Sequence, residues 1–264
     1  MRIASPAHAI FAATMIVLGI IGIVQGDFAP IWQPVPKNVA AREVLVYVTA
    51  AVTFACGAGL LWQRAAAWSA RVLLALLVLW LLAFKLTSLV KAPAAAVSYE
   101  SAGETAVIVA AAWILYAEFA TDWDRRHLSF AAGDMGVRLA RSQFGLSLIA
   151  FGVAHFAYVN ETAALVPAWL PWHVAWVDVT GAAYIAAGIA VLLGVFARWA
   201  ATLAAWQMGA FTAFVWLPAV ATGPSAEQWS EFVVSWTLVA SAWIVAASYG
   251  KMSPHARHDT RRSS

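Results

Sequence analysis

Residues 72–90 read VLLALLVLWLLAFKLTSLV, with a single charged side chain, Lys85, towards one end. The hydrocarbon core of a bilayer is about 30 Å thick, and roughly 20 helical residues at 1.5 Å each cross it. A lysine near the end of such a helix can extend its stem so that the ammonium group reaches the interface. This stretch therefore predicts a membrane-spanning helix.

Seven further stretches resemble this one in length and apolarity. The weakest is the fourth along the chain, whose uncharged centre is short and lies between Glu104 and Glu118. We expect an all-α polytopic membrane protein with eight transmembrane helices, at about residues 7–27, 44–62, 72–90, 103–120, 142–159, 174–195, 199–219 and 231–249.

The composition indicates the same class of protein. Of the 264 residues, 63% are hydrophobic and 11% are charged, against roughly 25% charged residues in soluble domains. These proportions exclude a disordered chain and a freely soluble enzyme. The single cysteine, Cys56, cannot form an internal disulfide. The net charge of +3 is small and scattered, so we expect the lipid bilayer and no nucleic acid as a partner.

The distribution of Lys and Arg predicts the orientation, because cytoplasmic loops are enriched in these residues. Four cations fall on one side of the predicted spans, and that side also holds eight carboxylates. We therefore expect both termini in the cytoplasm. The opposite, cytoplasmic side would hold twelve cations: Arg2, Arg64, Arg71, Arg125, Arg126, Arg138, Arg141, Arg198, Lys251, Arg257, Arg261 and Arg262.

The two halves of the chain align without a gap through their best-matched stretch when the sequence is shifted by 131 residues. Among the recurring residues, Pro36 matches Pro167, and Gly57 matches Gly188. Each copy would hold four spans, so both would face the same way and be related by a pseudo-twofold axis along the membrane normal. We expect a first four-helix repeat at 1–120, a cytoplasmic linker at 121–141, a second repeat at 142–250 and a cytoplasmic tail at 251–264.

The second copy contains Phe151-Gly152-Val153-Ala154-His155-Phe156, then a loop with Pro and Trp at 166–171, then Thr180-Gly181. This pattern resembles the DoxX-like family of bacterial four-helix membrane proteins, here as a tandem duplication. The resemblance covers roughly 142–250 directly and 8–120 by internal homology. It implies a bacterial inner membrane, and the family's namesake implies a membrane subunit of a quinone-reducing sulfur oxidoreductase. Quinone is therefore the ligand that the resemblance suggests.

The first copy departs from this pattern, with Val24 where the second has His155 and Tyr47 where it has Asp178. His155 and Asp178 would both lie roughly 6 Å below the outer interface at 1.5 Å per residue, and Glu231 at a similar level. These three side chains predict an outer polar cluster that relays protons or holds a polar ligand. The alternative is that His155 and Asp178 satisfy one another and only fix helix packing.

Asp27 and Glu100 are the nearest outer acids of the first copy, and Glu100 recurs as Glu231. Carboxylates at helix N-termini are also favoured by the helix dipole without any function. In the loop beyond the second copy's first span, Trp169 and Trp176 are either interfacial anchors or part of a lid over a pocket for a flat hydrophobic molecule such as a quinone.

The sequence shows no zinc-type Cys/His spacing and no activated nucleophile, so we expect neither a metal site nor catalytic residues. The leading hypothesis is a non-catalytic accessory or small-hydrophobic-ligand-binding component, at most a membrane subunit of a quinone-linked oxidoreductase. Its protein partners would be a redox partner protein or a second copy of the chain. A proton-coupled small-molecule transporter is the alternative.

Overall fold

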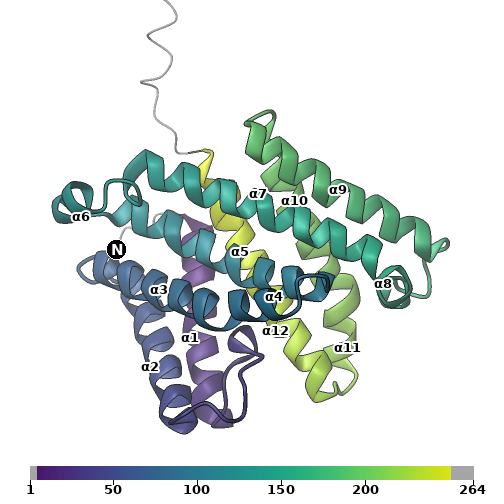
Figure 1. The fold of residues 1–264 in the computed structure, drawn as a ribbon, viewed down its shortest axis with the longest axis horizontal. Coiled ribbons are helices and arrows are strands. Elements are labelled where there is room, and N and C mark those ends of the chain that lie inside the picture. Colours follow the sequence, from purple (N-terminus) through teal and green to yellow (C-terminus); the bar gives the residue numbers. More distant parts are fainter. Residues whose placement is uncertain (1–4, 251–264) are drawn as a thin grey trace, which may run out of the picture.

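The computed structural model describes residues 5–250, and every regular element in this range is helical (Figure 1). The chain has the helix lengths and the apolarity of a multi-pass membrane protein. The predicted tail at 251–264 and the cations Arg2, Lys251, Arg257, Arg261 and Arg262 lie outside the described residues.

Seven helices in the described range are long and apolar enough to cross a membrane. The remaining predicted span corresponds to α7 (Gly133–Ala157) followed by α8 (Val159–Leu165), which together pass the same criterion but are bent by 97°. The seven are α1 (Pro6–Gln25), α2 (Arg42–Leu60), α3 to α4 (Ala66–Lys91), α5 (Ala96–Phe119), α9 (His173–Leu193), α10 to α11 (Ala197–Ala221) and α12 (Ala226–Ser248).

Two helices begin earlier than their apolar stretches predict. α5 begins at Ala96 rather than near 103, since a face that includes Ala102 and Thr105 is buried while the acidic residues lie between. α7 begins at Gly133 rather than near 142, because its first turns also pack against the protein and bury Ala140. Tertiary packing therefore extends both helices beyond what hydropathy alone indicates.

Two spans contain a π-helical turn at corresponding places. α3 (Ala66–Trp80) continues through η2 (Leu81–Lys85) into α4 (Leu86–Lys91). α10 (Ala197–Phe211) continues through η3 (Thr212–Trp216) into α11 (Leu217–Ala221). Both bounds of α3 and of η2 are separated from those of α10 and η3 by the same 131 residues. π-helical turns are rare and are frequently found at functional sites.

Helix α1 packs along α2 and helix α7 packs along α9, and the two pairs are inclined to each other (Figure 1). Close approach within each pair depends on glycine. A Cβ atom at Gly57 would lie 2.7 Å from the backbone nitrogen of Ile16, and one at Gly188 would lie 2.5 Å from the carbonyl oxygen of Gly145. Small residues let helix backbones meet in this way.

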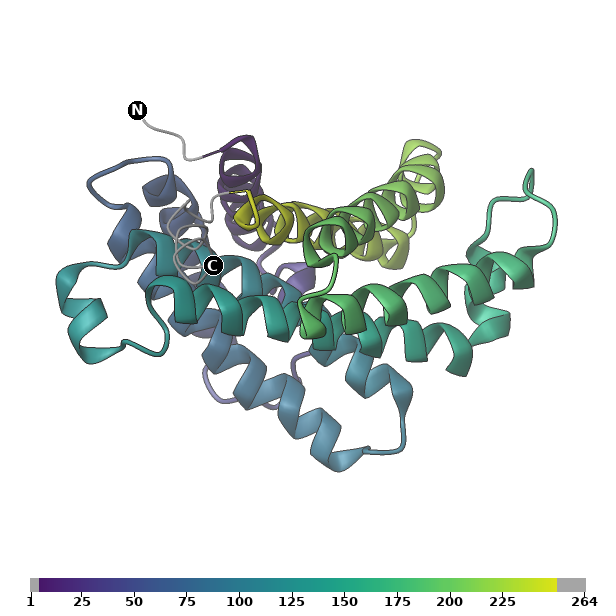
Figure 2. The ribbon, with the colours of Figure 1, turned by 90° about the horizontal axis from the view of Figure 1, so that it is seen from above.

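Helices α5 and α12 occupy the middle of the molecule. α5 packs against α3, α7 and α12, and the side chains from Val107 to Ala112 are almost completely buried. Seen from above, α12 (yellow) lies between α1 (purple) and α10 (green) (Figure 2). α12 starts with a capping box in which the Gln228 backbone N–H donates to Ser225 Oγ at 3.2 Å. α5 and α12 thus join the first half of the chain to the second.

Candidate functional site

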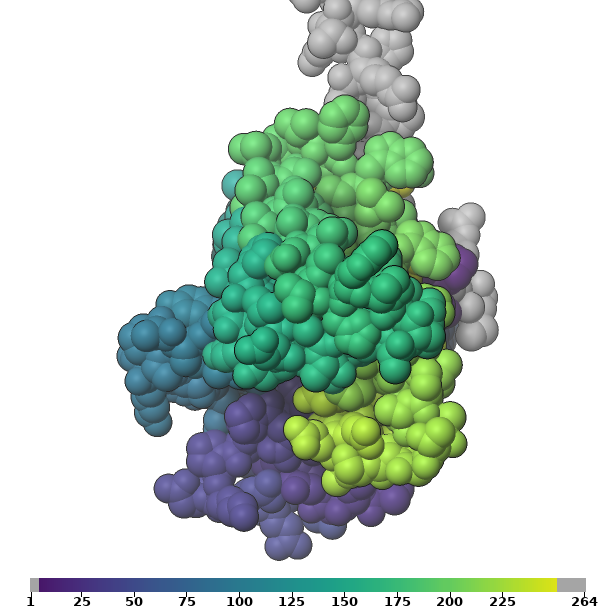
Figure 3. Space-filling view, turned by 90° about the vertical axis from the view of Figure 1, so that its right-hand side faces the viewer, coloured from purple at the N-terminus to yellow at the C-terminus, as the bar shows by residue number. Residues whose placement is uncertain are grey.

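A cavity of about 450 Å³ opens between α5, the α7–α9 segment, α10 with η3, and α12. Figure 3 shows this face of the molecule, where the teal-green end of α7 and α8 lies above the yellow-green start of α12. Most of the lining is apolar, and it includes six aromatic side chains that surround the space: Phe151, Trp169, Trp176, Phe211, Phe214 and Trp216.

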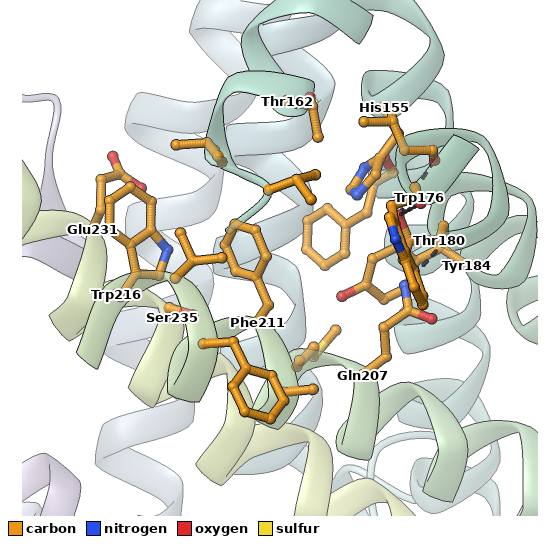
Figure 4. A pocket seen from close by; sticks show the side chains of 18 of the residues that line it. His155, Thr162, Trp176, Thr180, Tyr184, Gln207, Phe211, Trp216, Glu231 and Ser235 are labelled. Carbon is orange, nitrogen blue, oxygen red and sulfur yellow. Dashed lines mark hydrogen bonds between the residues drawn. The ribbon is translucent and has the colours of Figure 1, made fainter. Parts of the chain in front are cut away.

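One side of the cavity carries His155, Thr180, Tyr184 and Gln207 (Figure 4). The Nδ1 atom of His155 lies 2.9 Å from the Phe151 carbonyl oxygen. Because a carbonyl only accepts, this nitrogen carries the proton and Nε2 is left as an acceptor in the neutral ring. The His155 ring meets the Tyr184 ring edge-on, with centroids 5.5 Å apart. This side of the cavity therefore presents hydrogen-bonding groups on an aromatic wall.

Gln207 and Thr180 connect two helices on the same side. The Gln207 Nε2 atom donates to the Thr180 carbonyl oxygen at 3.0 Å, which joins α10 to α9. The Tyr184 hydroxyl interacts with the Gln207 side chain, and Tyr184 is 7% exposed. The polar groups are consequently held in place before any ligand enters.

The opposite side is acidic. Glu100 and Glu104 come from α5 and Glu231 comes from α12, and all three line the cavity. None of the three makes a hydrogen bond or an ion pair to another residue between 5 and 250. Figure 4 shows Glu231 and Trp216 across the cavity from His155. Three carboxylates thus face one enclosed space without a partner.

Five of the seven predicted site residues line this cavity, and they come from four different segments: Glu100, His155, Trp169, Trp176 and Glu231. Asp178 does not line it and is exposed. Trp176, Thr180 and Tyr184 follow one another at four-residue spacing and form the lining face of α9. Asp178 lies two positions after Trp176, so it points away from this face. His155 bonds instead to the Phe151 carbonyl.

Asp27, the remaining predicted residue, lies just after the end of α1 and away from the cavity. Its Oδ1 atom lies 2.7 Å from Arg42 Nη2 and accepts the Phe28 backbone N–H at 2.6 Å. The Arg42 guanidinium in turn lies over the Phe28 ring, 5.1 Å from its centroid. Asp27 therefore holds the α1–α2 loop against the start of α2.

Sequence reasoning missed Glu104, Tyr184 and Gln207 as members of the site. It treated Glu104 as the charge that limits a span, although Glu104 follows Glu100 by one helical turn and so shares its face. The stripe formed by Trp176, Thr180 and Tyr184 is the signal that points to the tyrosine. For Gln207 the signal is a lone amide inside an apolar span.

In the first half of the chain the corresponding space is filled. The residues 131 positions before Phe211 and Trp216 are Trp80 and Lys85. The Trp80 ring packs on Trp32 and Phe28, at centroid distances of 5.0 and 5.2 Å, and its Nε1 atom donates to the Trp32 carbonyl oxygen at 2.9 Å. Trp32 belongs to η1 (Pro30–Trp32) and is 1% exposed. The loop after α1 therefore occupies the space that stays open in the second half.

Lys85 is buried in this filled region rather than extended to the interface. Its Nζ atom donates to the Gln33 carbonyl oxygen and to Ser101 Oγ, the latter at 2.9 Å, and the residue is 4% exposed. Protein acceptors replace the water that the ammonium group would otherwise need. The loop between α8 and α9 behaves differently, since Trp169 is 69% exposed at the mouth of the cavity.

Among residues 5–250 no group of three or more His, Cys, Asp or Glu side chains is arranged to hold a metal ion. The cavity can accept hydrogen bonds, bury an apolar body and place carboxylates beside it. No family model, no curated protein and no solved structure matches this chain.

Proposed function

We propose that this chain is a non-catalytic membrane component that binds a small hydrophobic ligand in the cavity between α5, α9, α10 and α12. The observation that carries the proposal is the cavity itself, whose volume of about 450 Å³ falls within the range of about 300–1,000 Å³ typical of small-molecule sites. Its aromatic lining with a few polar groups is also typical of such sites.

We propose further that the chain is a DoxX-like protein of a bacterial inner membrane, with both termini in the cytoplasm. The common displacement of 131 residues between α3 with η2 and α10 with η3 supports a tandem duplication. The resemblance to the DoxX-like family makes quinone one candidate ligand, and a redox partner protein or a second copy of the chain would then receive it.

A proton-coupled transporter is the second candidate. It is favoured by one observation, the presence of four titratable side chains, Glu100, Glu104, His155 and Glu231, around a cavity at the junction of the two halves. Uptake into proteoliposomes that collapses when the pH gradient is dissipated would support this candidate.

The test of ligand binding compares two substitutions of alanine by tryptophan. Ala210 lines the cavity, so Ala210→Trp should fill it. Ala182, on α9, is exposed and does not line the cavity, so Ala182→Trp is the matched control. Hydrophobic molecules that co-purify in lipid nanodiscs would be extracted and identified by mass spectrometry.

We expect wild type and Ala182→Trp to retain a molecule that Ala210→Trp lacks. A soluble short-chain quinone added back should bind to the first two proteins with at least tenfold higher affinity than to the third if quinone is the ligand. Equal occupancy in all three proteins, or no hydrophobic molecule and no binding in any of them, would refute the proposed function.

A further inference from the structure

The charged groups that line the cavity are of one sign. Glu100, Glu104 and Glu231 contribute carboxylates, and no Lys or Arg is among the described residues of the lining. His155 is the single basic side chain there, and it lies on the opposite side with its Nδ1 proton directed to the Phe151 carbonyl oxygen. An anionic ligand would therefore meet repulsion without a counter-charge.

The nearest cation, Lys85, does not complete the charge balance. It interacts electrostatically with Glu104 from outside the cavity lining, beyond ion-pair distance, and its ammonium group donates to the Gln33 carbonyl and to Ser101. One ammonium thus faces three carboxylates that lack hydrogen-bond partners within residues 5–250. Carboxylates removed from water are costly unless a partner supplies charge or hydrogen bonds.

The aromatic side chains lie where a cation would benefit from them. Trp216 is beside Glu231 in Figure 4, and Phe211 lies between the acidic side and the His155 side. The faces of Trp and Phe rings attract cations, most strongly when both are shielded from water. The leucine and valine side chains of the lining are suited to a hydrocarbon body.

We infer that the occupant of this cavity is a lipophilic monocation, an amine or quaternary ammonium compound whose charged head lies among Glu100, Glu104 and Glu231 and whose apolar body contacts the aromatic wall. This inference rests on the proposed function, namely that the cavity holds a hydrophobic ligand. It names the charge class of that ligand and sets it apart from a neutral quinone.

The test uses three probes with one scaffold: a phenylalkyl-trimethylammonium ion, its uncharged tert-butyl analogue and the phenylalkyl carboxylate of the same length. Binding to the full chain in nanodiscs of zwitterionic lipid would be measured by tryptophan fluorescence and by calorimetry, with empty nanodiscs as the blank for partitioning. We expect the ammonium probe to bind at least tenfold more tightly than its uncharged analogue, and the carboxylate to bind more weakly than both.

The variants Glu104→Gln and Glu231→Gln remove charge while nearly preserving volume. Each should reduce the preference for the ammonium probe by about tenfold, with little change for the uncharged analogue. Glu43→Gln, at the exposed start of α2 and outside the cavity, is the matched control and should retain the full preference. Thermal unfolding of each variant in the same nanodiscs shows that it is folded, and two separate variants guard against the loss of one.

The outcomes separate this inference from the proposed function. Equal affinity for the ammonium probe and its uncharged analogue, or an unchanged preference in both glutamine variants, would overturn the cation assignment while leaving hydrophobic-ligand binding in place. Failure of all three probes and of quinone to bind would refute both.

Discussion

The guanidinium group of Arg71, on α3, lies 2.7 Å from the carboxylate of Asp124, on α6 (Asp122–His127), and the Asp124 side chain is 1% exposed. Asp124 also accepts a hydrogen bond from the Tyr116 hydroxyl at 3.0 Å and forms a capping box with Thr121. The segment that joins the two halves is therefore fixed to both α3 and α5. The sequence favoured a solvated connector here, and a buried carboxylate in a charged run gave no sign of its partner.

Removal of this carboxylate should destabilise the protein. Asp124→Ala leaves Arg71 without its partner, and breaking a buried pair from one side costs about 3–5 kcal/mol. Asp122→Ala, two residues earlier and exposed, is the control and should change stability by less than about 1 kcal/mol. Chemical denaturation in detergent micelles measures the difference, and similar values for the two variants would show that the buried network contributes little.

The same residue predicts a pH dependence. Burial of the Asp124 carboxyl would raise its pKa, but hydrogen bonds from Thr121, Arg71 and Tyr116 outweigh this effect and hold the pKa well below its usual range. Its stabilising contribution is therefore complete above the unfolded pKa of about 3.9 and is lost as the pH falls through the lower folded pKa. The stability difference between wild type and Asp124→Asn should be constant from pH 7 to about 5 and should shrink in stronger acid. A difference that grows on acidification would contradict this assignment.

The filled region of the first half gives a third prediction. Trp32→Ala removes a large buried side chain from contact with Trp80, and such a change costs about 3–5 kcal/mol. Trp172→Ala removes an indole that is 80% exposed and should be nearly neutral. Thermal unfolding in nanodiscs compares the two, and equal midpoints would mean that η1 does not support the first half.

Helix contact within the α7–α9 pair gives a fourth prediction. A methyl group at Gly188 would lie 2.5 Å from the Gly145 carbonyl oxygen, so Gly188→Ala should separate the helices at a cost of about 1–3 kcal/mol. No atom lies within 4 Å of the Cβ position at Gly209, and alanine there should be neutral or stabilising by up to about 1 kcal/mol. Unfolding midpoints test the pair, and a Gly188→Ala variant as stable as wild type would exclude close packing at this point.

Hydropathy predicted the helical class and the approximate position of each apolar stretch, since these depend on composition and length alone. It also indicated depth, because 1.5 Å per residue placed His155 and Glu231 near one level, and both line the cavity. Depth says nothing of rotation about the helix axis, which is why Asp178 was grouped with His155 although it points elsewhere. Glu104 and Lys85 were likewise read as markers of span ends, because their partners lie on other helices and cannot be seen locally.

The burial of Trp32 bears on stoichiometry. Because η1 already occupies the space beside Trp80, the chain offers a ligand one cavity of this type rather than two. A titration should therefore saturate at one equivalent per chain and follow a simple hyperbola with a Hill coefficient of about 1. Any cooperativity would have to arise between separate copies of the protein in the bilayer.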